Sequence, residues 1–183
     1  MRLPAISLAL CVAASSLACA AYDPARDPKI PRPPKVVEWS HALHIDAPPE
    51  QVWAVLVDFE HYAEWNPWLV AGHGPAQVGA RVDITVILDG KQRELWHRVV
   101  SVEENEGFCW RDGGPTTGFA TGLRCRTLEA DGEGGTNFRV VLTVGGAFRK
   151  TVVKRYGEQL QSAMEAETAA LGVEAQRRFA AEG

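Results

Sequence analysis

The sequence predicts an α+β fold in which one antiparallel sheet is covered by a long C-terminal helix. Three observations predict it: an alternating segment followed by two short helical segments, a run of further alternating segments between glycine-containing turns, and a proline-free stretch over about 149–182. A sheet with one apolar face needs a cover, and only the last stretch is long enough to supply it. The gap between a twisted sheet and such a helix suits an apolar ligand.

The composition is that of an ordinary globular domain. The chain has 183 residues, with 46% hydrophobic and 23% charged residues, which suits a single domain. Its formal net charge is −4 and no run of Lys or Arg stands out, so no nucleic-acid partner is predicted. Six Trp residues favour large buried contacts.

Residues 1–20 read as an export signal. One positive charge precedes a short uncharged run that ends in Ala18-Cys19-Ala20, and this run is too short for a membrane span. The two alanines suit ordinary signal peptidase, whereas the letters SLAC resemble a bacterial lipobox in which Cys19 is the lipidated N-terminus, with Ser where Leu is usual. Either cleavage predicts an exported, periplasmic protein, and a lipid anchor would be its one link to a membrane.

Residues 21–35 contain five prolines and several charges, so they predict a tether or an extended arm before a domain over 36–183. The segment 36–48 alternates as a strand, with Trp39, His41, Leu43 and Ile45 on one face. A short helix over 47–58 follows, and a second over 59–68 is stopped by Pro67. There Asn66 can satisfy backbone groups.

About six further antiparallel strands are predicted. The clearest of them lie over 80–88, 93–103, 107–112, 121–130 and 136–146, and the letters DGK after the first of these supply a hairpin turn. In the final helical stretch, apolar residues recur at three- to four-residue and seven-residue spacing: Val153, Tyr156, Leu160, Met164 and Leu171. Glu167 falls on this stripe and is expected to weaken it locally.

The segment 45–70, IDAPPEQVWAVLVDFEHYAEWNPWLV, resembles the opening of the START-like (SRPBCC) superfamily, which includes polyketide cyclase/dehydrase and lipid-transport proteins. The later letters VGARVDI and RVVSVEENEGFCW and the long last helix keep the order of that family over about 36–175. The resemblance implies a helix-grip fold, in which a seven-stranded antiparallel sheet surrounds the C-terminal helix and a hydrophobic cavity. Members include carriers, receptors and enzymes, so the fold does not name a reaction.

The predicted function is the binding of a small hydrophobic molecule or lipid in that cavity, without a cofactor. An inward strand register and the family's cavity give the candidate ligand-binding residues: Trp65, Trp68, Val86, Leu95, His97, Trp110, Arg124, Phe138, Tyr156 and Leu160. The two Trp rings of the WNPW motif are expected to plug the fold first and to contact ligand second.

The alternative is a cyclase or dehydratase, in which His97 is a base and Arg124 holds an anionic or carbonyl oxygen. The sequence alone assembles no catalytic pair, and no histidine or cysteine spacing predicts a metal site. A third class, an interaction module, would have a filled cavity and an exposed apolar patch instead.

Two cysteines, Cys109 and Cys125, remain after removal of residues 1–20. They are equidistant from position 117, and with Phe108 and Trp110 facing inward both cysteines face outward, so they could lie opposite each other. Two free thiols and a disulfide that locks this hairpin both stay open, and an oxidising compartment favours the disulfide.

Overall fold

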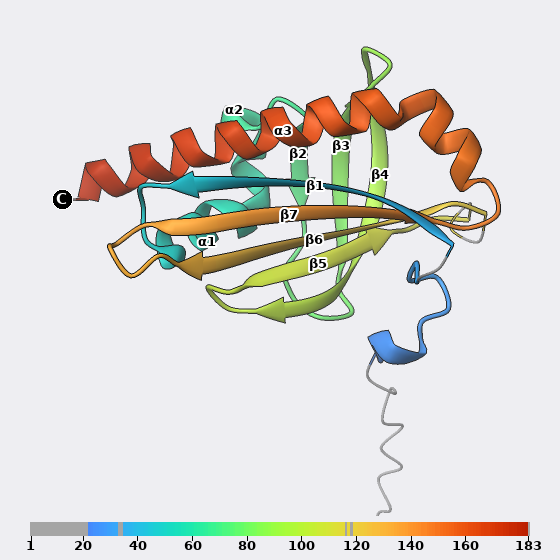
Figure 1. The fold of residues 1–183 in the computed structure, drawn as a ribbon, viewed down its shortest axis with the longest axis horizontal. Helices are drawn as coiled ribbons and strands as arrows, with labels where there is room; N and C mark the ends of the chain where they lie inside the picture. Colours follow the sequence, from blue (N-terminus) through green and yellow to red (C-terminus); the bar gives the residue numbers. More distant parts are fainter. Residues whose placement is uncertain (1–21, 33–34, 116, 118, 183) are drawn as a thin grey trace, which may run out of the picture.

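The computed structural model describes residues 22–182, except 33–34, 116 and 118. The predicted export signal and the lipidation candidate Cys19 lie outside the described residues. The described part contains a seven-stranded antiparallel sheet, two short α-helices after the first strand, and a long C-terminal helix (Figure 1). This arrangement confirms the predicted helix-grip fold. Within this part, no helix has the length and apolar character needed to cross a membrane.

The sheet has the strand order β1-β7-β6-β5-β4-β3-β2. In Figure 1, β2, β3 and β4 run nearly across the direction of β1 and β7, and α3 lies along one side of the sheet. The helices are α1 (Pro49–Val57), α2 (Tyr62–Trp65) and α3 (Arg149–Glu182), and the strands are β1 (Val36–Ile45), β2 (Leu69–His73), β3 (Arg81–Leu88), β4 (Lys91–Glu103), β5 (Gly107–Asp112), β6 (Thr121–Ala130) and β7 (Thr136–Gly145).

The WNPW motif turns the chain from α2 into β2. Asn66 has extended backbone angles, as the residue before Pro67 must, so the helix ends there. Its side-chain Oδ1 accepts hydrogen bonds from the backbone N–H groups of Trp68, at 3.0 Å, and Leu69, at 2.9 Å. The expectation that Asn66 satisfies backbone groups at this stop is confirmed.

Alternation along the strands places one set of side chains between the sheet and α3. Pairing of β5 with β6 sets Trp110 opposite Arg124 and Cys109 opposite Cys125, so the two pairs face opposite sides of the sheet. The buried inward set includes Val82, Ile84, Val86, Val99, Phe108, Trp110, Val140 and Leu142. Cys109 and Cys125 are joined as a disulfide on the outer side.

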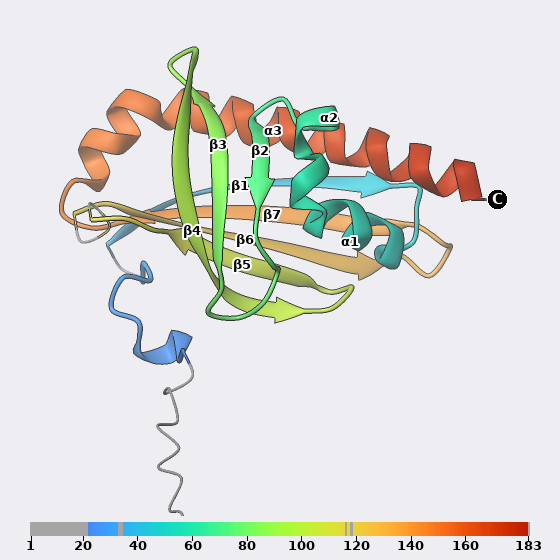
Figure 2. The same cartoon turned by 180° about the vertical axis from the view of Figure 1, so that it is seen from behind.

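Residues 22–32 form an arm that lies against the sheet on the side opposite α3 (Figures 1 and 2). Arg111 of β5 and Asp27 form a buried ion pair at 2.5 Å, and the Tyr22 hydroxyl donates to the same carboxylate at 2.6 Å. Burial and this carboxylate raise the pKa of Tyr22 to about 12. Within this arm, Pro24–Arg26 form a short 3₁₀ helix.

Candidate functional site

A cavity of about 750 Å³ lies between the inner face of the sheet and the first half of α3. Its volume is within the range of small-molecule sites, and apolar side chains dominate its wall. The polar lining residues are Arg93, Asp112 and Thr121. The apolar ones come from β3, β4, β7, α3 and the segments that precede β2, β6 and α3: Trp68, Leu88, Leu95, Phe119, Ala120, Leu142, Val144, Phe148, Val152, Tyr156 and Leu160.

Two exposed aromatic rings stand at this cavity. Phe119 precedes β6 and Phe148 precedes α3, and their ring centroids are 5.6 Å apart. More than half of each side chain is exposed to solvent, at 57% and 56%. Large exposed rings beside a cavity are apolar surface that a bound hydrophobic molecule could cover. No periodic pattern predicts either ring, since both lie in connecting segments.

A buried ionic cluster lies under the inner end of the cavity. Glu167 of α3 accepts hydrogen bonds from Arg124 Nη1 at 2.7 Å, Arg126 Nη2 at 3.3 Å and Asn66 Nδ2 at 3.2 Å. All four side chains are buried. Burial lowers the pKa of Arg124 to about 10, which still leaves it charged at neutral pH. Glu167 therefore does not merely weaken the apolar stripe of α3; it is the anion that two buried cations share.

Trp68 separates this cluster from the cavity. The Arg124 guanidinium carbon lies 3.9 Å from the centroid of the Trp68 ring, in a cation–π contact, and the same ring lines the cavity. Arg124 is thus bound to Glu167 and stacked on Trp68. The cluster fixes the position of the indole, and the indole forms part of the wall that a ligand would meet.

A second polar group is built on β4 and β5. His97 stacks on Trp110 with ring centroids 4.8 Å apart, and its Nε2 lies 3.4 Å from Oδ1 of Asp112. The other Asp112 oxygen accepts from the Gly122 backbone N–H at 2.6 Å. His97 Nδ1 is buried and has no hydrogen-bond partner among the described residues. Only Asp112 of this pair lines the cavity.

The ten predicted ligand-binding residues fall into two groups. Those that line the cavity are Trp68, Leu95, Tyr156 and Leu160. The other six lie elsewhere in the interior: Val86 and Trp110 in the core, His97 on Trp110, Arg124 behind Trp68, and Trp65 and Phe138 around Glu167.

Sequence reasoning missed Asp112 and Glu167. Glu167 carried one signal, a carboxylate on an apolar helical stripe, and buried carboxylates are normally paired. Asp112 carried none, because its pairing with His97 depends on the register of β4 and β5. Among the described residues, no three His, Cys, Asp or Glu side chains are grouped so that they could hold a metal ion.

The family model described as "Polyketide cyclase / dehydrase and lipid transport" matches residues 37–174. A search of the curated proteins finds no significant match. Among solved structures, the Zhui aromatase/cyclase from Streptomyces sp. R1128 matches with a TM-score of 0.67 and 16% identity over 78% of this chain and 95% of that one.

Two further structures have the same fold. A START superfamily protein from Mycobacterium smegmatis has a TM-score of 0.61 and 20% identity, over 76% of this chain and 97% of its own. Norcoclaurine synthase from Thalictrum flavum, in complex with dopamine and hydroxybenzaldehyde, has a TM-score of 0.59 and 14% identity, over 78% and 87%. At these identities the likeness shows the fold alone.

Proposed function

Because the chain belongs to the polyketide cyclase/dehydrase and lipid transport family, we propose that it binds a small hydrophobic molecule or lipid between its sheet and α3. The observation that carries this proposal is the cavity of about 750 Å³ with its largely apolar wall. Trp68, Leu142 and Leu160 would contribute buried contact area, and each fully buried apolar side chain contributes roughly 1.5–3 kcal/mol.

The polar groups near the cavity favour binding over reaction. Arg124 is already neutralised by Glu167 and covered by Trp68, so it does not present a free cation to a ligand. Arg93, Asp112 and Thr121 reach the wall and could orient one polar group of an otherwise apolar molecule. A ligand with a single hydrogen-bonding end on a hydrocarbon or aromatic body fits this distribution.

We place this activity in the cell envelope, in the periplasm. The support is the predicted export signal at 1–20, together with the disulfide between Cys109 and Cys125, which persists in oxidising compartments. Cys19 is the candidate for a lipid anchor, and ordinary signal peptidase cleavage is the alternative. Mass spectrometry of the exported protein distinguishes them, because lipidation adds acyl chains to an N-terminal Cys19 and ordinary cleavage adds none.

The ligand itself is accessible to a direct experiment. Protein purified from its native envelope is extracted with organic solvent, and the extract is analysed by mass spectrometry. We expect one class of hydrophobic compound in near-stoichiometric amount. Repeated absence of any such compound, together with no saturable binding of fatty-acid or aromatic probes, would contradict the proposal.

A second function is supported by the His97–Asp112 pair. An enzyme that acts on a polyketide-like or aromatic substrate needs a general base, and an Asp that orients a His is a common way to supply one. The structure places these two side chains 3.4 Å apart, and Asp112 is the member of the pair that lines the cavity. If this function holds, His97→Ala abolishes turnover of such a substrate while the thermal unfolding midpoint stays within a few degrees of wild type; retained turnover excludes it.

A further inference from the structure

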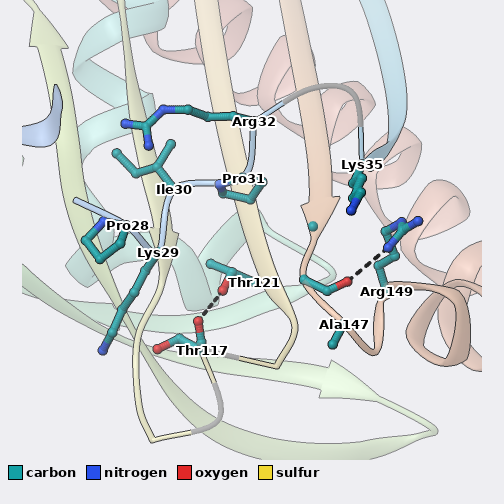
Figure 3. Close-up of a pocket in the computed structure, with 12 residues that line it drawn as sticks. Pro28, Lys29, Ile30, Pro31, Arg32, Lys35, Thr117, Thr121, Ala147 and Arg149 are labelled. Atoms are coloured by element: carbon teal, nitrogen blue, oxygen red, sulfur yellow. Dashed lines mark hydrogen bonds between the residues drawn. The ribbon is translucent and has the colours of Figure 1, made fainter. Parts of the chain in front are cut away.

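A second concave site lies at the end of the sheet where β6 begins and β7 ends, apart from the apolar cavity. It is a cleft of about 710 Å³ between the arm at 22–32, the loop before β6 and the connection from β7 to α3 (Figure 3). Among its described lining residues, Thr121 alone is shared with the apolar cavity. Its floor carries the two threonines Thr117 and Thr121, whose hydroxyls donate to backbone carbonyls.

The lining of this cleft is basic. Lys29, Arg32, Lys35 and Arg149 all line it, and none of its described lining residues is acidic. Among the described residues, none of these four cations forms an ion pair. Elsewhere in the described part of the chain, Arg and His side chains pair with nearby carboxylates, as Arg124 does with Glu167, and the chain as a whole carries a net charge of −4. A cationic cleft without counter-charges is therefore a local departure from the charge balance of the molecule.

Two of the cations converge. Figure 3 shows the Lys35 side chain and the Arg149 guanidinium pointing toward one another across the cleft. Arg149 Nη1 donates to the Gly146 carbonyl at 3.3 Å, which orients the guanidinium and leaves its other donors available. Like charges that face each other destabilise the fold unless an anion lies between them.

The Arg32 guanidinium binds the arm itself: it donates to the carbonyls of Pro24, Ala25 and Asp27. It holds the turn of the arm, and the buried Asp27–Arg111 pair anchors the same turn to β5. The part of the wall that carries Lys29 is thus fixed to the sheet, and Lys35 directly precedes β1. The site is built before a ligand arrives, which lowers the entropic cost of binding.

We propose that this cleft binds a phosphate group, held between Lys35 and Arg149, and that this is a binding site separate from the apolar cavity. A phosphate presents several acceptor oxygens and up to two negative charges, which suits one ammonium and one forked guanidinium. The group could belong to a soluble phosphate compound or to the headgroup of an anionic phospholipid, and the chemistry at the cleft is the same for both.

The test uses two probes with the purified full-length chain: inorganic phosphate, titrated by calorimetry, and vesicles of phosphatidylglycerol in phosphatidylcholine, assayed by co-sedimentation against pure phosphatidylcholine vesicles. The cleft variant is Lys35→Gln with Arg149→Gln. The matched control is Lys91→Gln with Lys154→Gln, which removes two positive charges from exposed positions outside the cleft.

We expect the cleft variant to weaken binding at least about tenfold, because two charge-assisted contacts are lost, and the control to change it less than about twofold. Binding of inorganic phosphate that the cleft variant weakens and the control variant does not identifies a soluble ligand. Binding to phosphatidylglycerol vesicles alone, with the same pattern, identifies a lipid headgroup. Absence of binding to both probes overturns the proposal, and so does equal weakening by the two double variants, which would show only non-specific charge attraction. Neither result bears on the apolar cavity.

Discussion

The buried cluster around Glu167 allows a sharp prediction about stability. The substitution Glu167→Gln keeps the size of the side chain and removes its charge. It leaves Arg124 and Arg126, which are 5% and 2% exposed, as two neighbouring cations without an anion. Arg126 Nη1 already lacks a hydrogen-bond partner among the described residues, so few other acceptors surround these two arginines.

The expected cost follows from that geometry. Removal of one partner from a buried ion pair typically destabilises a protein by about 3–5 kcal/mol. That is a large part of the roughly 5–15 kcal/mol that holds a domain of this kind together. For a protein of this size, each kcal/mol lowers the unfolding midpoint by about 2–4 °C, so we expect a decrease of about 6–20 °C.

Urea unfolding of the oxidised protein, followed by Trp fluorescence, measures this cost. Glu158→Gln is the control, since Glu158 is an exposed carboxylate on the same helix and should change the free energy of unfolding by no more than about 0.5 kcal/mol. Arg124→Met should cost less in the Glu167→Gln background than in wild type, because it then removes an unpaired buried cation. A loss below about 1 kcal/mol for Glu167→Gln, the value of an exposed pair, would refute the idea that the cluster is buried and mutually dependent.

Three other predictions concern the disulfide, the carboxylates and the arm. Replacement of both Cys109 and Cys125 by Ser should lower the free energy of unfolding by about 3 kcal/mol, because the bridge closes a loop with a sequence separation of 16. If reductant left the urea midpoint of the wild-type protein unchanged, this prediction would be contradicted. The hydrogen bond from Arg177 holds the pKa of Glu174 at about 2, below its ordinary value of 4.5. A carboxyl with a lowered folded pKa stabilises the protein above its unfolded pKa, so stability should fall as the pH drops from about 4.5 toward 2, and Glu174→Gln should flatten that part of the pH profile; parallel wild-type and variant profiles would argue against it. Asp27→Asn removes the charge that anchors the arm to Arg111, so trypsin should cleave within 22–32 faster while the rest of the domain stays protected, and an unchanged cleavage rate would show that the ion pair does not hold the arm.

The fold could be predicted from the sequence because each of its features is local. Alternation along β1, the Asn66-Pro67 stop and the proline-free length of α3 each depend on neighbouring residues, and the resemblance to the START-like superfamily supplied their arrangement. Inward and outward faces of the strands followed from period two alone, which is why Trp110 and Arg124 were correctly expected to face inward.

The candidate site was less predictable because its contacts join distant parts of the chain. Glu167 meets Asn66 across 101 residues and Arg124 across 43, and no local pattern encodes such a meeting. An inward register says that a side chain faces the interior, and it does not distinguish the cavity wall from the packed core. Val86 and Leu160 illustrate this, since both are in phase and only Leu160 lines the cavity.

The cavity between the sheet and α3 is the central element of this account, and a titration with a fluorescent fatty acid tests it most directly. Val152→Trp places a large ring in the cavity wall, whereas Val173→Trp puts the same ring on the same helix at a position that is 67% exposed. We predict saturable binding by wild type and by Val173→Trp, and at least about tenfold weaker binding by Val152→Trp at an unchanged unfolding midpoint. Equal binding by all three proteins, or no saturable binding by wild type, would contradict a ligand in this cavity.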